Sequence, residues 1–325
     1  MNYNEFKQTL QEEIQARCSK QINFMEDTAL KSNEVLESLC VRVQEETASP
    51  VVYPEKLYAD YQNGVPVALM ADKIAASVSD APVLEMPDLT PQNAERSVSF
   101  SLLNKEKNGE LLKDCPHRII HDMAAIPRWH ISDEASFIVN NRVMEQLQMT
   151  KEEILDIAQK NTEEKSYTCQ SMKEAMKEVM MDEGMSEELV SELLPMPELP
   201  FFVISNQSRT DGSCAILSDR FMQQAAEQTG MDEMYLLPSS RHEMIAISPK
   251  ITGNATDARE LKEMVMSVNS DAGIMRAEDF LSNSVYKYDA KTHSLSMCDS
   301  MGIFHDKTAV KDGLKPAGKG RGMNR

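Results

Sequence analysis

Residues 201–248 read FFVISNQSRTDGSCAILSDRFMQQAAEQTGMDEMYLLPSSRHEMIAIS, and this stretch decides the fold because its local signals agree. It predicts strands at 201–205, 214–217, 234–237 and 244–247, with a helix between the second strand and the third. Ser218 is a typical N-cap for that helix, and Gly230 suits the left-handed residue that follows a helix end. We therefore expect an α+β fold with a mixed or antiparallel sheet covered by helices.

The sequence on either side of this stretch predicts two unequal α+β parts. Residues 1–80 form the smaller N-terminal α+β unit, with a helix over 3–18, strands over 21–29 and 35–43, and two further helices. Residues 81–91 hold three prolines without periodicity, which is typical of a linker or loop. Residues 92–305 form the main α+β domain, and residues 306–325 are a basic tail without an apolar pattern, which indicates disorder.

An acidic, methionine-rich helical block precedes the central stretch, from Glu152 to Met196. Three hydroxyl residues, Thr150, Ser171 and Ser186, each stand just before an apolar helical run and predict helix N-caps. A groove lined by methionines suits a partner helix, because methionine adapts to irregular surfaces. The competing interpretation is a set of ordinary amphipathic helices with solvated acidic faces.

Charge and cysteine usage restrict the class of protein. The net charge of −18 argues against binding to nucleic acid through phosphate neutralisation and against binding to an anionic membrane. No run of 18 apolar residues predicts a membrane span, and the N-terminal residues do not resemble a secretory signal. The six cysteines are scattered without a CxxC pair, so we expect reduced thiols and a cytoplasmic location.

Two polar turns in the central stretch hold the candidate ligand-binding residues. Ser239, Ser240, His242 and Glu243 lie in the second turn, but their spacing does not fit a triad, because Glu243 points away from His242 on an extended chain. Arg209 and Asp211 lie in the first turn, where an arginine fork suits a carboxylate or phosphate. The alternative for both turns is a structural loop whose polar groups bond the backbone. We assign no catalytic residue, and whether the turns face each other decides between these interpretations.

A third group, Cys115 with His117, His121 and His130, has weak metal-ligand spacing. His117 and His121 share a face only if this segment is helical. The chain lacks a Walker A loop, a GxGxxG turn, an HExxH helix and an EF-hand loop. We therefore predict neither a metal site nor a cofactor.

Several longer strings resemble a family of uncharacterised bacterial proteins, a domain-of-unknown-function family common in anaerobic gut bacteria and often found near mobile elements. They are KSNE (31–34), SPVVYPEKLYADYQNG (49–64), LLNKEKNGELL (102–112), PH (116–117), ISNQSR (204–209), LLPSSRHE (236–243), MVMSVN (264–269) and LSNSVYKYD (281–289). The resemblance covers 2–297 and supplies no catalytic residue. It implies an apolar residue where this chain has His121, which further disfavours a metal.

These observations favour a non-enzymatic cytoplasmic protein that acts through contacts with a protein partner. The negative charge, the 23 methionines and the missing catalytic motifs are its basis. An acidic surface that imitates DNA is one form of this function. The alternative is a small-molecule binder or hydrolase that uses the 206–212 loop and the 239–243 turn.

Overall fold

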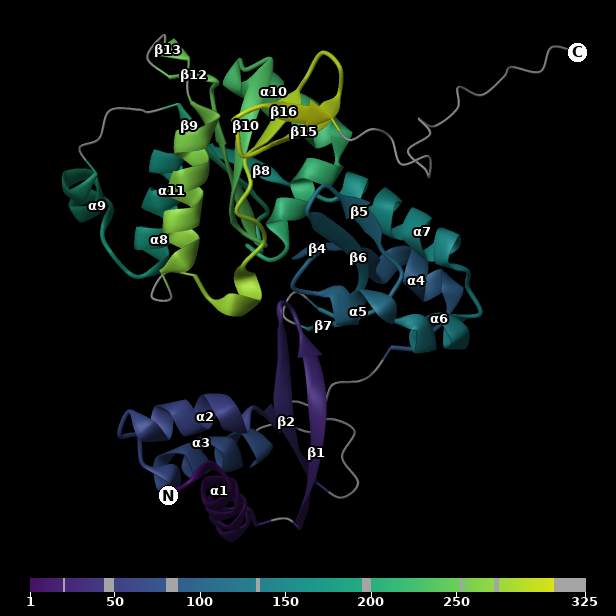
Figure 1. Ribbon diagram of the computed structural model, residues 1–325, viewed down its shortest axis with the longest axis vertical. Helices are drawn as coiled ribbons and strands as arrows, with labels where there is room; N and C mark the ends of the chain where they lie inside the picture. The colour runs from purple at the N-terminus through teal and green to yellow at the C-terminus, as the bar shows by residue number, and fades with distance from the viewer. Residues whose placement is uncertain are drawn as a thin grey trace, which may run out of the picture. The chain divides into compact units, whose positions relative to one another are not determined.

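The computed structural model describes residues 1–19, 21–43, 50–79, 87–132, 135–194, 200–251, 254–255, 257–271 and 275–306. Two compact units divide them: the first unit holds 1–164 and 275–281, and the second unit holds the rest (Figure 1). The described strands pair antiparallel and are accompanied by helices, which confirms the α+β class. The predicted linker at 81–91 lies mostly outside the described residues, as does the tail after Asp306. The predicted domains at 1–80 and 92–305 stay predictions.

The N-terminal part of the first unit packs helices against a three-stranded sheet. Its helices are α1 (Tyr3–Arg17), α2 (Pro54–Gln62) and α3 (Val67–Ser79), and its strands are β1 (Ile22–Lys31), β2 (Glu34–Val43) and β3 (Val51–Val52). Phe6, Leu10 and Ile14 recur along one face of α1 and are fully buried, as the helical period predicts. A capping box between Asn2 and Glu5 fixes where α1 begins.

The remainder of the first unit is a four-stranded sheet with helices. The strands β4 (Val98–Asn104), β6 (Met123–His130) and β5 (Arg118–Ile120) follow one another across the sheet, and β7 (Ser136–Ile138) also pairs with β6. The helices are α4 (Pro91–Ser97), α5 (Gly109–Lys113), α6 (Asn141–Leu147) and α7 (Lys151–Glu164). The hydroxyl of Thr162 in α7 accepts from the Phe100 N–H at 2.9 Å, which seats α7 on β4.

The second unit is built on a seven-stranded sheet in the order β16-β15-β14-β10-β11-β9-β8. Its strands are β8 (Thr168–Ser171), β9 (Phe201–Ser205), β10 (Glu233–Ser240), β11 (Glu243–Ile247), β14 (Tyr286–Asp289), β15 (Ser294–Cys298) and β16 (Phe304–Asp306). The helices are α8 (Met172–Asp182), α9 (Glu187–Leu193), α10 (Asp219–Thr229) and α11 (Ala258–Ser270), and the short strands β12 (Lys250–Ile251) and β13 (Asn254–Ala255) form a separate pair. The central stretch therefore supplies β9, β11 and β10 of this sheet.

One predicted strand in the central stretch is wrong. Residues 214–217 belong to a 3₁₀ helix, Gly212–Leu217, and do not run back beside β9. Both edges of β9 are already paired, one with β11 and the other with β8, so a further strand has no place there. The positive φ of Asp211 (54°) turns the chain, and the Ser213 hydroxyl donates to the Arg241 carbonyl at 2.5 Å. A short apolar run such as 214–217 fits a strand and a buried helical turn equally well, so the sequence alone does not distinguish them.

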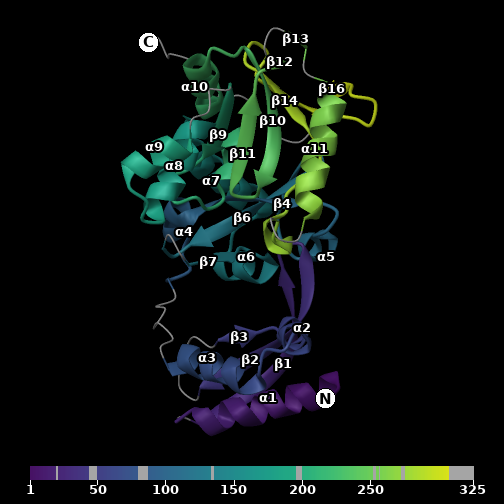
Figure 2. The same ribbon diagram turned by 90° about the vertical axis from the view of Figure 1, so that its left-hand side faces the viewer.

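The helices of the second unit cover the two faces of its sheet unequally. Leu237, Ile247 and Val285 form one core with Leu261 and Val265 of α11. Helix α8 lies on the same face as α11, and α10 lies on the opposite face (Figures 1 and 2). Ser218 caps α10, and Gly230 ends it with φ 68°, as the sequence predicts. The face that bears α8 and α11 is the less completely covered of the two. Val203 and Ile245 on this face are half-buried, whereas Ile204 and Met244 on the opposite face are fully buried.

Candidate functional site

The two predicted turns lie side by side at one end of the seven-stranded sheet. Strands β9 and β11 are antiparallel, so the segment after β9 and the turn before β11 meet at the same end. The N–H of Asp211 donates to Nδ1 of His242 at 3.1 Å, and the Ser205 hydroxyl donates to the His242 carbonyl at 2.8 Å. The 206–212 loop and the 239–243 turn are therefore bonded to each other.

The charged residues of the loop separate into a buried one and an exposed one. The carboxylate of Asp211 is 1 % exposed and lies 3.0 Å from the guanidinium of Arg241. Arg209 is 47 % exposed and turns outward, where it pairs with Glu178 and Asp182 of α8 at 3.6 Å and 3.3 Å. Arg241 is the residue that sequence reasoning missed as the partner of Asp211. Both arginines adjoin the same turns, so only the tertiary structure distinguishes them.

The hydroxyl and imidazole groups of the turn bond to their own neighbours. Ser239 donates to the Glu243 carboxylate at 2.7 Å, and Ser240 accepts from the His242 backbone N–H at 3.0 Å. Because Nδ1 of His242 accepts from a backbone N–H, this nitrogen cannot take a proton from a serine. These bonds fix the two loops to each other and do not place a serine hydroxyl at Nδ1 of His242.

The cysteine and histidine group does not form a common site in the structure. His117 stands just before β5, its Nδ1 is 3.0 Å from the Cys115 carbonyl, and His121 adopts φ 55° in the turn between β5 and β6. His130 lies at the end of β6, with Nε2 2.9 Å from the Ser99 hydroxyl. Burial raises the pKa of the Cys115 thiol to about 12, which favours the protonated, weakly ligating form. Within the part of the chain that the structure describes, no three His, Cys, Asp or Glu residues are grouped to hold a metal.

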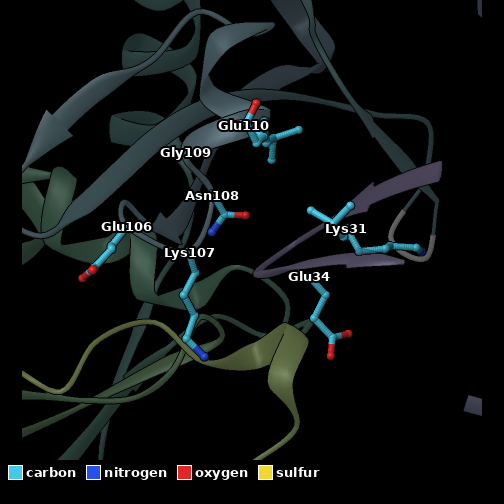
Figure 3. Close-up of a pocket in the computed structure, with 9 residues that line it drawn as sticks. Lys31, Glu34, Glu106, Lys107, Asn108, Gly109 and Glu110 are labelled. Atoms are coloured by element: carbon cyan, nitrogen blue, oxygen red, sulfur yellow. The ribbon is translucent and has the colours of Figure 1, made fainter. Parts of the chain in front are cut away.

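A small pocket in the first unit lies beside the tip of the β1–β2 hairpin (Figure 3). Its volume of about 160 Å³ is below the 300–1,000 Å³ that is usual for small-molecule sites. Asn33 and Asn108 connect its two sides: the Asn33 N–H donates to Oδ1 of Asn108 at 2.8 Å, and Nδ2 of Asn108 donates to Oδ1 of Asn33 at 2.7 Å. Lys107 extends away to the Phe280 ring, 4.5 Å from its centroid. The pocket is formed where these two asparagines hold the hairpin tip against residues 106–111.

Two helices of the second unit, α8 and α11, expose large apolar side chains to solvent. Helix α8 has an apolar stripe at helical spacing, formed by Met172, Ala175, Met176, Val179 and Met180, yet none of its residues is buried. Met176 and Val179 are 40 % and 42 % exposed. On α11, Met264 and Val268 are 58 % and 41 % exposed. We call these four residues, with the half-buried Phe201, Val203 and Ile245 on the strands between the helices, the apolar face.

The register of the strands and the orientation of α11 assign Val203, Ile245 and Val268 to one side of the sheet, the side on which α8 also lies (Figure 2). Val203 pairs with Ile245, so both point to the same side of the sheet, and Ile245 packs against the α11 core. Arg259 on α11 lies beside Gly302 in the β15–β16 turn. Val268 is nine residues later, about two and a half turns at 3.6 residues per turn, and lies on the opposite flank, toward β11 and β9. Figure 2 shows β9 and β11 between α8 and α11, without a helix of the second unit in front of them.

The segment that carries α8 and α9, next to the apolar face, is acidic. Residues 172–193 hold seven carboxylates against two lysines: Glu174, Glu178, Asp182, Glu183, Glu187, Glu188 and Glu192 against Lys173 and Lys177. Lys177 pairs with Glu187, and Arg209 of the neighbouring loop pairs with Glu178 and Asp182, so the carboxylates still outnumber the cations by seven to three. An apolar centre with a charged rim is the usual composition of a protein-binding surface.

A family model described as a family of unknown function (DUF5688) matches residues 3–290, and the chain belongs to this family. Comparisons with curated proteins and with solved structures gave no match. Among the described residues, no helix is long and apolar enough to cross a membrane. These findings do not assign an activity.

Proposed function

We propose that this protein acts without catalysis, by binding another protein through the apolar face of its second unit. The partner segment is apolar at its centre and positively charged at its rim. The observation that carries the proposal is the exposure of α8, an amphipathic helix that packs on β8 and β9. Its apolar stripe has no fully buried residue, and Met176 and Val179 in it are exposed. Contiguous exposed apolar patches on folded proteins mark interaction sites more often than they occur without a role.

The alternative function, hydrolysis or small-molecule binding at the 206–212 loop and the 239–243 turn, receives less support. The charged and polar groups of these segments serve each other and the backbone, as the pairs Asp211–Arg241 and Ser239–Glu243 illustrate. A small-molecule site needs polar groups that are directed at the ligand. The two segments are better explained as structural loops that hold β9 and β11 together, and these strands carry Val203 and Ile245 of the apolar face.

The cytoplasm is the compartment that we propose for this function. All six cysteines lie in the described part of the chain as thiols outside any disulfide, and Cys115, Cys169, Cys214 and Cys298 are buried. Buried thiols of this kind are usual where the surroundings are reducing. Burial raises the pKa of Cys169 to about 11, which keeps this thiol unreactive.

Affinity capture with matched variants tests the proposal. Val179→Glu and Met264→Glu together place two charges in the apolar face without touching the core, because both side chains are exposed. Met25→Glu in β1, at a residue that is 51 % exposed, is the control. We expect a protein retained by the wild type and by Met25→Glu to decrease at least about tenfold with the double variant, or about 1.4 kcal/mol. Equal retention by all three proteins, or no enriched protein at all, contradicts the proposal.

A further inference from the structure

We infer that the partner segment that occupies the apolar face is a cationic amphipathic α-helix. This inference rests on the proposed function and specifies its partner. Three observations carry it: the short edge strand beside α8, the spacing of the apolar residues on α8 and α11, and the charge around them.

An added strand is a poor alternative at this site. Strand β8 forms the sheet edge next to α8 and has four residues, Thr168–Ser171. Its last residue, Ser171, is also the N-cap of α8, where its hydroxyl accepts from the Glu174 N–H. A strand added at this edge therefore gains few main-chain hydrogen bonds before α8 begins, and those bonds are the main source of affinity in strand addition.

The apolar residues on both helices recur every three or four residues, which is the spacing that lets another helix pack against them. Met172, Met176 and Val179 follow one another by four and three residues on α8, and Met264 and Val268 by four residues on α11. Such rows form ridges that fit the grooves of a third helix at an axis separation of about 8–10 Å. Methionine side chains adapt to the partner surface, as is usual where a helix is bound in a groove.

The negative charge next to the apolar face favours a cationic partner helix and disfavours a second copy of this chain. The segment 172–193 keeps an excess of carboxylates, seven against Lys173, Lys177 and the Arg209 that pairs with Glu178 and Asp182. This excess attracts lysine and arginine at the rim of a partner helix. A symmetric dimer through the same face would bring two such acidic segments together in a protein whose net charge is −18. Residues 307–325 of the chain are also basic, so the test includes their removal.

Binding of designed peptides to the full chain tests the inference. The probes are three labelled leucine–lysine or leucine–glutamate peptides of about 14 residues, the length that spans α11 at about 1.5 Å per residue. The first has apolar residues at helical spacing with lysines, the second has the same composition in strict alternation, and the third is the helical peptide with glutamate in place of lysine. Fluorescence anisotropy gives their affinities for the wild type, for Val179→Glu with Met264→Glu, and for Met25→Glu.

We expect the helical lysine peptide to bind the wild type and Met25→Glu at least about tenfold more tightly than either other peptide. The double variant adds negative charge, so attraction by charge alone predicts tighter binding, whereas docking on the apolar face predicts a loss of at least about tenfold. Binding that is unchanged or tighter in the double variant overturns the inference. Removal of residues 307–325 that strengthens peptide binding at least about tenfold also overturns it, because the chain's own tail is then the occupant.

The remaining outcomes separate this inference from the proposed function. If the alternating peptide binds best and the double variant abolishes that binding, the proposed function stands. The inference that the partner is a helix is then wrong. If the glutamate peptide binds as tightly as the lysine peptide, the cationic partner is wrong and the face still binds. If the helical lysine peptide fails while affinity capture retains a partner through the face, the inference is wrong and the proposed function stands.

Discussion

The guanidinium of Arg241 and the carboxylate of Asp211 form an ion pair of 3.0 Å that joins two loops, and the carboxylate is almost wholly buried. Arg241→Ala leaves a buried negative charge without this guanidinium. We expect the free energy of unfolding near this pair to fall by about 3–5 kcal/mol, as is usual when one partner of a buried pair is removed. Hydrogen exchange of the β9 and β11 amides measures this change locally.

Arg209 provides the matched control for this experiment. It is the same residue type on the neighbouring loop, but its pairs with Glu178 and Asp182 are exposed. Arg209→Ala should change the protection of β9 and β11 by less than about 1 kcal/mol, because exposed ion pairs contribute little. A similar loss of protection in both variants would show that the burial of the Asp211–Arg241 pair is not what stabilises the loops.

Gly212 is required because the two loops approach each other too closely for a side chain. A Cβ atom at this position would lie 2.4 Å from both the His242 carbonyl oxygen and the Ser205 hydroxyl. Gly212→Ala therefore forces the loops apart, and we expect a loss of about 1–3 kcal/mol, the usual cost of overpacking. Calorimetry should record a lower melting temperature for this variant.

Gly109 tests whether the effect is specific to the site. It begins α5, and a Cβ atom there meets nothing within 4 Å. Gly109→Ala should leave the melting temperature unchanged or raise it, because alanine is favoured over glycine in a helix by about 0.5–1 kcal/mol. An equal decrease in both variants would contradict the close approach at Gly212.

The sequence predicted those elements whose signals lie within a few residues. Phe6, Leu10 and Ile14 predicted α1, because a buried helical face repeats every three to four residues. Ser171 predicted the start of α8 through a capping box that the structure confirms. Ser218 and Gly230 predicted the two ends of α10, which the structure also confirms.

The remaining features depend on residues that are distant in the chain. Residues 214–217 could not be assigned from their own composition, because the pairing of both edges of β9 decides their structure. The choice of Arg241 over Arg209 as the partner of Asp211 follows from the register of β9 and β11. The unburied stripe of α8 is likewise not visible in its sequence, which is that of an ordinary amphipathic helix.

Asn108 holds the tip of the β1–β2 hairpin through two hydrogen bonds with Asn33. Besides its two bonds with Asn33, it donates to the Asn104 carbonyl at 2.7 Å, and it is nearly inaccessible to solvent. Asn108→Ala leaves the Asn33 N–H without this acceptor, so we expect a loss of about 1–3 kcal/mol. The fluorescence of Trp129, buried in β6 of the same unit, follows urea unfolding.

The exposed Asn63 at the end of α2 is the control for Asn108. Asn63→Ala removes the same amide from the surface, and we expect a change within about 0.5 kcal/mol. If Asn108→Ala is as mild as Asn63→Ala, the hydrogen bonds at the hairpin tip do not stabilise the first unit.

Asp299 makes the β15–β16 turn sensitive to acid. The hydrogen bond with Nε2 of His305, at 2.7 Å, and those from the backbone N–H groups of Ile303 and Met301 lower the pKa of this carboxyl to about 2. A folded-state pKa below the ordinary value near 3.8 means that ionised Asp299 stabilises the fold above that pH. This stabilisation is lost as the pH falls toward 2.

NMR titration of the Asp299 carboxyl carbon measures the midpoint directly, and we expect about 2 in the wild type. His305→Ala removes the largest cause of the shift, so the midpoint should move upward toward the ordinary value. In urea unfolding, Asp299→Asn should be less stable than the wild type at pH 6, and this difference should shrink as the pH falls through the wild-type midpoint. Met301→Ala is the control, because it keeps the backbone N–H that bonds Asp299 and should leave the midpoint unchanged. A midpoint that does not respond to His305→Ala would mean that the backbone N–H groups alone hold the carboxylate ionised.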